Sequence, residues 1–118
     1  MRTGCLVEQG TGRVLVARVG RTTNALERMR GLLGRPPPDA GAGLLISPCG
    51  AVHTAGMAYP IDVVFLDREL RVRRLVAGLA PWRSAACRGA RHTLELRAGA
   101  LAGLGLAPEQ RLEWRETE

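Results

Sequence analysis

The segment Ile61–Leu66 (IDVVFL) is the feature that most constrains how this chain can fold. Apart from Asp62 its residues are apolar, so an extended segment would present apolar side chains on both faces. Such a strand needs cover on both faces and therefore lies inside a sheet. With 118 residues, the chain suits one domain with one core. We therefore expect a single domain, residues 1–118, built around this strand.

Short apolar or alternating segments, separated by turn-forming residues, predict further strands. These segments are residues 6–8, 13–19, 44–47, 71–79, 91–97 and 110–115. The alternation slips at Arg73–Arg74, which indicates a β-bulge or a sheet edge. In residues 91–97 the alternation places His92 on the apolar face and Glu95 on the polar face. We expect His92 to pack in the core and Glu95 to be an exposed cross-strand partner.

One helix is predicted near residues 24–33. Asn24 followed by Glu27 is a capping-box pattern, and Pro36–Pro38 prevents the helix from continuing. Apolar residues at helical spacing form one face, namely Ala25, Leu26, Met29 and Leu33. The small residues 99–105 suit a short helical turn. Several strands with one clear helix exclude a doubly wound fold, which needs alternating strands and helices.

We therefore predict a mainly β (α+β) domain. Its sheet would be a small β-barrel-like structure or a folded sheet, and the short helix would cover an opening or an edge. No internal repeat or domain linker interrupts the chain.

The chain carries a formal net charge of +6, and all 17 of its basic residues are arginine. A basic patch could bind nucleic acid. However, the arginines are spread along the chain, and only Arg71, Arg73 and Arg74 lie close together. The sequence also lacks an RNP-type aromatic motif and zinc-finger spacing. Nucleic acid is therefore not the expected partner, and arginine-mediated nucleic-acid binding is a further alternative.

Cysteine usage and hydropathy indicate a cytoplasmic location. The three cysteines, Cys5, Cys49 and Cys87, form no CxxC pair and are expected to be free thiols. No run approaches the ~18 apolar residues of a membrane span. The N-terminal residues lack the apolar core of a secretory signal.

Several different short motifs lie between about Thr22 and Leu112, and the most specific is Met57-x-x-Pro60-Ile61-Asp62. The others are Arg28–Leu32 with Arg35, Gly43–Leu45, Pro48–Cys49, His53–Thr54, Val63–Asp67, Pro81–Arg83, Leu94–Leu96 and Ala98–Gly99. Together these motifs resemble the bacterial and archaeal family called domain of unknown function 192. The resemblance implies a fold family and candidate site positions, but no reaction.

One departure from that family is visible. Its members usually have a Gly-Asp turn before the last strand, where this chain has Pro108–Gln110. Many relatives also carry an N-terminal export or anchoring segment that is not seen here, which again favours the cytoplasm.

Cys49, His53 and Met57 are the residue types of a soft metal site. They are spaced four residues apart, which on an extended strand means about 13 Å at 3.3 Å per residue. Neighbouring Pro and Gly residues oppose a helix, so only a tight loop would bring the three together. We therefore predict no metal and no cofactor, and expect Cys49 and Met57 to pack as hydrophobic residues.

Asp62 is expected to be buried, because it interrupts the apolar strand. A buried carboxylate needs hydrogen bonds or an ion pair. Asp62 should therefore accept backbone N–H groups, or pair with Arg28 or Arg35. In the functional alternative it lines a pocket together with His53, whose side chain suits acid–base chemistry near neutral pH.

No complete catalytic motif occurs in the sequence. We therefore favour a small, non-enzymatic accessory module that binds a small ligand or a protein partner through a polar pocket beside residues 48–62. The candidate ligand-binding residues are Arg28, Arg35, His53, Thr54, Asp62, Trp82 and Arg83. The alternative is a hydrolase-like enzyme with His53 and Asp62 as the acid–base pair and Arg28 or Arg35 holding an anionic group.

Overall fold

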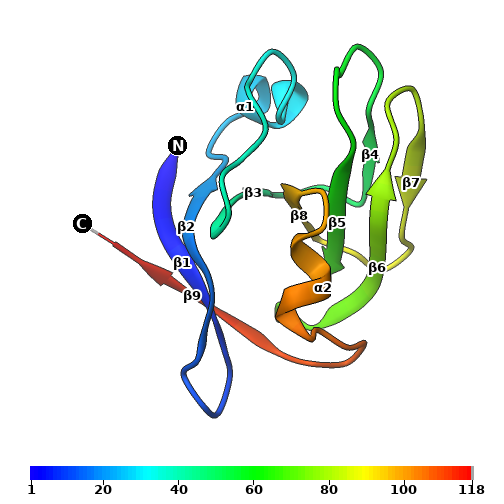
Figure 1. Ribbon diagram of the computed structural model, residues 1–118. Coiled ribbons are helices and arrows are strands. Elements are labelled where there is room, and N and C mark those ends of the chain that lie inside the picture. The colour runs from blue at the N-terminus through cyan, green and yellow to red at the C-terminus, as the bar shows by residue number, and fades with distance from the viewer. Residues whose placement is uncertain (118) are drawn as a thin grey trace.

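Residues Ile61–Leu66 form strand β5, and all six are buried. The computed structural model describes residues 1–117 (Figure 1). Strand β5 lies between β6 (Val72–Leu79) and β8 (His92–Arg97) and is antiparallel to both. The predicted interior position of this strand is confirmed.

The main sheet has seven strands in the order β6-β5-β8-β3-β2-β1-β9. The remaining strands of this sheet are β1 (Arg2–Glu8), β2 (Val14–Arg21), β3 (Ala42–Ile46) and β9 (Leu112–Glu116). Only β2 and β3 pair in parallel, and the segment that joins them contains helix α1 (Ala25–Arg30). Two strands missed by the sequence patterns, β4 (Ala51–His53) and β7 (Ser84–Ala86), form a separate antiparallel pair.

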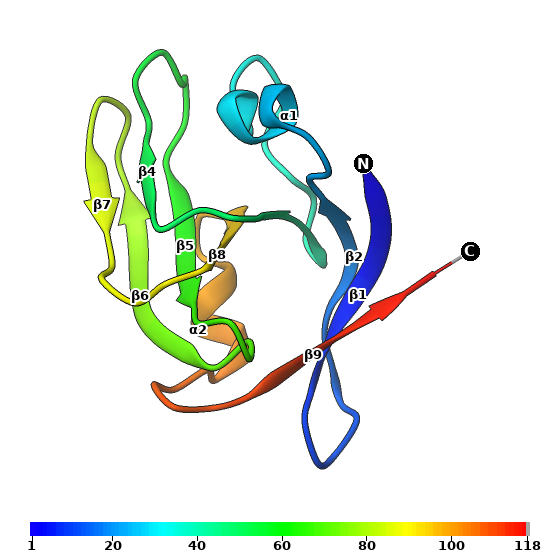
Figure 2. The same ribbon diagram turned by 180° about the vertical axis from the view of Figure 1, so that it is seen from behind.

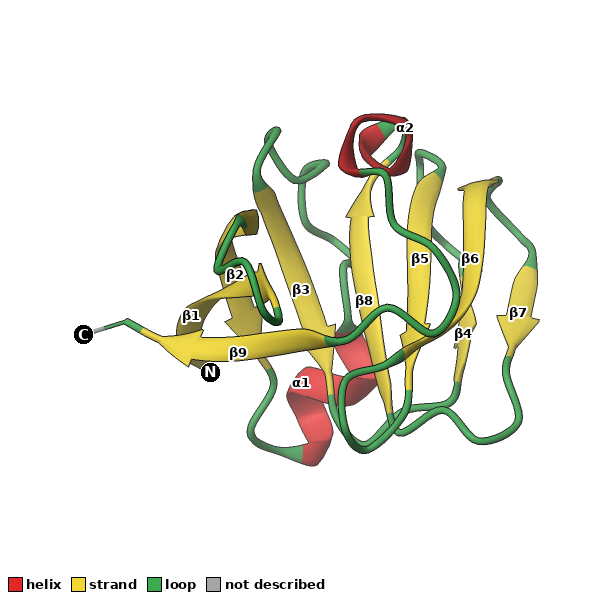
Figure 3. Cartoon of the chain, turned by 90° about the horizontal axis from the view of Figure 1, so that it is seen from below, coloured by secondary structure: helices red, strands yellow, loops and turns green. Residues whose placement is uncertain are grey.

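The sheet is folded but not closed, so the folded-sheet alternative is correct and the domain is mainly β, as predicted. Strands β6 and β9 are its edges. The two ends of the sheet approach each other near an isolated bridge between Arg71 and Arg111, where the Val72 N–H donates to the Gln110 carbonyl at 2.8 Å. Figure 3 shows β9 running across the view, at a steep angle to β3 and β8.

Two hydrophobic cores lie on opposite faces of the sheet. The first contains Val64, Leu94 and Leu96 and is closed by residues of helix α2 (Ala100–Leu104). The second contains Val63, Phe65 and Val52 of β4, together with Leu32, which follows α1. Figures 1 and 2 show β4 and β7 beside the end of the sheet formed by β5 and β6. Strand β8 is therefore covered on both faces.

Helix α1 is shorter than predicted, with six residues. Its predicted cap is present: the Asn24 Oδ1 accepts the Glu27 N–H at 2.9 Å, and the Glu27 carboxylate accepts the N–H of Thr23 at 2.7 Å. However, the apolar residues of α1 are not buried: Leu26 is 78% and Met29 77% exposed. The helix lies at the end of the sheet and not on its face, so only the residues after it reach the core.

The predicted irregularity at Arg73–Arg74 is confirmed. Phe65 pairs with Arg74 and Leu66 with Val72, so Arg73 is the extra residue of a bulge on an edge strand. The predicted helical turn at residues 99–105 is also present, as α2. Within residues 1–117, neither helix has the length and apolar character required to span a lipid bilayer.

Candidate functional site

A cavity of about 70 Å³ lies between the end of α1, strand β4 and strand β8. Leu32, Ile46 and Met57 contribute apolar walls. The polar side chains at this cavity are Arg28, Arg30, Cys49, His53 and Glu95. Arg28 and Arg30 come from the last turn of α1, Cys49 and His53 from β4 and its flank, and Glu95 from β8. The volume accommodates a few water molecules or a small polar group.

Glu95 is the most unusual group at this cavity. It is only 3% exposed, and its Oε1 atom has no hydrogen-bond partner within residues 1–117. Burial raises the pKa of Glu95 to about 7. The Leu32 backbone N–H opposes this shift and lowers the pKa in part. Near neutral pH the carboxyl group therefore exists in both protonated and ionised forms.

The predicted exposure of Glu95 is wrong, and the reason lies in the neighbouring strand. Glu95 does alternate with Leu94 and Leu96, but it pairs with Val63 of β5 on the covered second face. A strand that is apolar on both faces requires cover on both sides, and its partner strand shares that cover. The apolar run in Ile61–Leu66 was thus the sequence signal that could have identified Glu95 as buried.

Cys49, His53 and Met57 all border the cavity, although their spacing predicted that they would be separated. The chain turns at residues 54–60 and returns into β5, which places Met57 near β4. Met57 is buried, as predicted. Cys49 is only half-buried, and its Sγ donates a hydrogen bond to the Ala51 carbonyl at 3.0 Å. Within residues 1–117, no group of three or more His, Cys, Asp and Glu side chains could hold a metal ion.

Asp62 does not reach this cavity. Its carboxylate accepts the backbone N–H groups of Gly78 at 2.8 Å and of Gly99 and Leu101 at 3.0 Å each. The backbone alternative of the sequence prediction is therefore correct. Asp62 pairs with Leu96, whereas Val63 pairs with Glu95, so the two carboxyl groups lie on opposite faces of the sheet.

The other predicted site residues separate into different places. Arg28 and His53 border the cavity, whereas Arg35 borders a hollow beside Pro36–Pro38 and donates to the Gly31 carbonyl. Thr54 is fully buried, and its Oγ1 donates to the Ala80 carbonyl at 2.6 Å and accepts the Arg83 N–H at 2.9 Å. It links two loops and does not face solvent.

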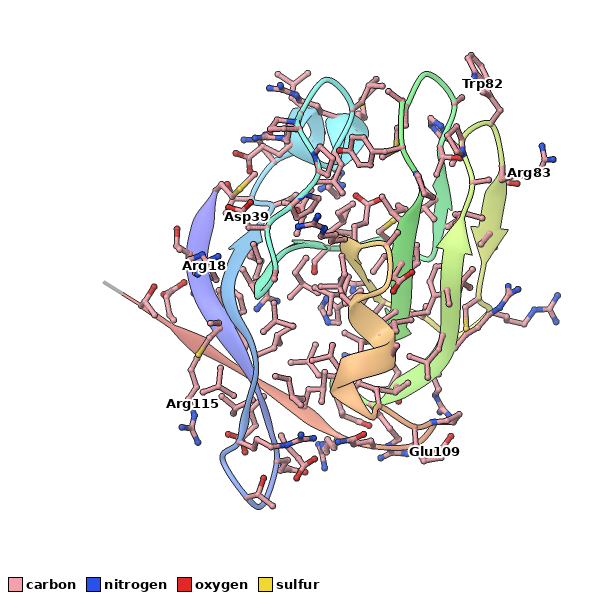
Figure 4. The ribbon with its side chains drawn as sticks, viewed as in Figure 1. Arg18, Asp39, Trp82, Arg83, Glu109 and Arg115 are labelled. Carbon is pink, nitrogen blue, oxygen red and sulfur yellow. The ribbon has the colours of Figure 1, made fainter. Side chains whose placement is uncertain are left out.

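Trp82 and Arg83 lie on the loop between β6 and β7, and Trp82 is 69% exposed. Figure 4 shows both side chains pointing outward, away from α1. They are not among the residues that border the cavity.

His92 packs in the core, as predicted, and is 7% exposed. Its Nδ1 lies 2.5 Å from the Ser47 Oγ. Burial, aided by the positive charges of Arg21 and Arg91, lowers the pKa of His92 to about 4. This histidine is therefore a neutral structural residue at physiological pH.

Comparison with known proteins agrees with the fold. The model of the family described as "DUF192: Uncharacterized ACR" matches residues 6–114. No curated protein matches the chain. A Sinorhizobium meliloti protein described as a "putative transcription regulator" is similar in structure, with a TM-score of 0.80 and 22% identity over 96% of this chain and 92% of the other. A Novosphingobium aromaticivorans protein of unknown function has a TM-score of 0.75 and 22% identity, over 95% and 84% of the two chains.

Proposed function

This chain belongs to the DUF192 family, and from that premise we propose that it is a small binding module. The cavity between α1, β4 and β8 would hold one polar group of a small ligand. The proposal extends the expected polar pocket beside residues 48–62, and assigns its floor to Glu95.

The unpartnered Oε1 atom of Glu95 is the observation that carries this proposal. A buried polar atom without a hydrogen bond costs on the order of 1–3 kcal/mol, so such atoms are rare in folded proteins. Here the atom belongs to a side chain that borders a cavity. A ligand that bonds to the carboxyl group would recover that free energy when it binds.

The surroundings of Glu95 also suit binding. Met29 and Leu33 border the cavity and are both exposed, so apolar side chains flank its mouth. His53 and Arg28 add polar groups at the same mouth. Apolar walls with a few polar groups are typical of small-ligand sites, although this cavity is smaller than a drug-sized pocket.

Two features argue against the hydrolase-like alternative. The carboxylate of Asp62 is engaged by three backbone N–H groups on the far face of the sheet from the cavity. The thiol of Cys49 donates a hydrogen bond to the Ala51 carbonyl, whereas a nucleophilic cysteine acts as a thiolate.

The arginines near the β5–β6 turn also give little support to nucleic-acid binding. Arg73 forms ion pairs with Asp67 and Glu109, and Arg71 with Glu69 and Glu109. These acids offset the charge of the densest basic segment in the sequence.

Amide chemical-shift mapping tests the proposal with four probes: methylammonium, acetamide, acetate and inorganic phosphate. At least one probe should shift amides of residues 28–33, 49–57 and 93–97. The substitution Ala55→Trp, at the cavity wall, should abolish those shifts. Ala86→Trp is the matched control, because Ala86 is exposed on β7 and does not border the cavity. Shifts that persist in A55W, or no response to any probe, would contradict the proposal.

A further inference from the structure

We propose that the ligand is a small zwitterion, whose ammonium group binds the carboxylate of Glu95 while its anionic group binds Arg28 and Arg30 at the cavity mouth. This inference rests on the proposed function and names the chemistry that the same cavity would select. A short spacer between the two charged groups would match the size of the cavity, about 70 Å³.

Within residues 1–117, the protein supplies no hydrogen-bond donor to the Oε1 atom of Glu95. The Tyr59 hydroxyl, close enough for the charge of Glu95 to affect its pKa, donates to the Arg35 carbonyl at 2.9 Å. The Cys49 thiol donates to the Ala51 carbonyl. The Leu32 backbone N–H lowers the pKa of Glu95, but Oε1 itself has no hydrogen-bond partner among the residues that the structure describes. A ligand must therefore bring its own donors.

An ammonium group is the most suitable donor for Glu95, because it offers three N–H donors and a positive charge to a carboxylate. A neutral donor would satisfy the oxygen but would leave the ionised form of Glu95 buried without a counter-charge, which is costly. Within residues 1–117, Glu95 has no ion pair with any arginine.

The two arginines that border the cavity are Arg28, which is half-buried, and Arg30, which is exposed at the mouth. Neither forms an ion pair within the described part of the chain, and Arg30 only donates from Nε to the Leu33 carbonyl at 3.1 Å. The nearest acid along α1, Glu27, is engaged by Thr23 and by the N-terminal ammonium group at 3.0 Å. The mouth is therefore positive, which disfavours a simple cation and favours a ligand that also carries an anion.

Titration provides a distinctive signature. The titratable and charged groups that border the cavity with Glu95 are Arg28 and Arg30 from α1 and Cys49 and His53 from β4 and its flank. Tyr59, in the loop before β5, is close enough for the charge of Glu95 to raise its pKa. Because the pKa of Glu95 is about 7, its carboxyl group is protonated in roughly half of the molecules at pH 7. Binding of an ammonium group would ionise the protonated Glu95 carboxyl groups and release about half a proton per ligand bound.

Isothermal titration calorimetry in buffers of different ionisation enthalpy tests this with three probes of similar length: β-alanine, propylamine and propionate. We expect β-alanine to bind most tightly, to release protons at pH 7, and to bind more tightly at pH 8 than at pH 6. Glu95→Gln should weaken β-alanine binding by about tenfold or more, because it removes a charged hydrogen-bond partner. The exposed-site variant Asp39→Asn should leave it unchanged.

The opposite arrangement would have a protonated Glu95 donating to a ligand carboxylate. Propionate would then bind at least as tightly as β-alanine, with proton uptake, and this result would overturn the proposal. Equal or tighter binding of propylamine would also overturn it, as would undiminished binding of β-alanine to E95Q.

Failure of this inference is distinguishable from failure of the proposed function. If β-alanine fails while acetamide or acetate still shifts the cavity amides, and A55W abolishes those shifts, the cavity binds ligands of another chemistry. If no probe binds at all, both proposals fall together.

Discussion

Gly31 and Glu95 face each other so closely that a Cβ atom on Gly31 would lie 3.1 Å from the Glu95 Oε1. Gly31 ends helix α1 with φ at 52° and ψ at −128°, a conformation that residues with a side chain rarely adopt. The glycine thus serves two purposes: it lets the chain leave the helix, and it leaves room for the carboxyl group at the cavity floor.

The substitution Gly31→Ala should therefore destabilise the fold by about 2 kcal/mol or more, through backbone strain plus the contact with Glu95. Gly34→Ala is the matched control, because Gly34 also has a positive φ, 73°, but a Cβ there meets nothing closer than 3.8 Å. Urea unfolding should show the larger loss for G31A. In a Glu95→Ala background the cost of G31A should approach that of G34A, and equal costs in both backgrounds would refute the steric coupling.

The pH dependence of stability should change when Glu95 is replaced by Gln. The folded-state pKa of Glu95, about 7, lies above its ordinary value of 4.5, so its contribution is fully present below pH 4.5 and is lost as pH rises to about 7. The loss amounts to about 3 kcal/mol at most. E95Q should remove this contribution, so its free energy of unfolding should rise relative to that of the native protein as pH increases through that range. Urea unfolding at pH 5 and pH 8 checks the prediction, and parallel profiles for the two proteins would contradict it.

His92 should produce the opposite dependence. Its folded-state pKa, about 4, lies below the ordinary 6.5, so the stability it contributes is present above pH 6.5 and is lost as pH falls towards 4. His92→Gln should therefore reduce acid sensitivity by up to about 3 kcal/mol between these pH values.

The two groups act in overlapping pH ranges with opposite signs, so the native profile between about pH 4.5 and 6.5 should be flatter than that of either variant. In this window E95Q should lose stability on acidification, and H92Q should lose it as pH rises. Identical slopes in all three proteins would show that neither group carries the shifted pKa.

Asp62→Ala should cost about 3 kcal/mol or more, because it leaves three N–H groups without their acceptor and frees the start of α2. Asp39→Asn, at an exposed position, should change the free energy of unfolding by about 0.5 kcal/mol or less. Hydrogen exchange should also speed up at the Gly99 and Leu101 amides in D62A. Unchanged protection of these amides would contradict the anchoring role.

Much of the fold was predictable from local patterns. The apolar run at Ile61–Leu66 predicted an interior strand, the slip at Arg73–Arg74 predicted a bulge or a sheet edge, and Asn24 with Glu27 predicted the helix start. Each of these signals arises from neighbours in the sequence, where side-chain direction and backbone hydrogen bonding are set by spacing.

The candidate site was less predictable. Arg28 and His53 were identified and do border the cavity, but Glu95 was expected to be exposed. The pair β4–β7 is too short for a periodic pattern to show, and this pair helps to cover the face on which Glu95 lies. The exposure of Leu26 and Met29 also depends on the position of α1 at the end of the sheet, and could not be predicted from the spacing of apolar residues along the helix.

By itself, the sequence determined the alternation of β8, the capping of α1 and the need of Asp62 for partners. Only the tertiary structure decided that both faces of β8 are covered and that Asp62 and Glu95 lie on opposite sides of the sheet. Alternation sets which side chains share a face, but burial depends on what packs over that face. For Glu95 the cover comes from Gly31, Leu32 and the residues around β4, which are far from it along the chain. A carboxyl that is ordinary in the sequence thereby becomes a buried group in need of a partner.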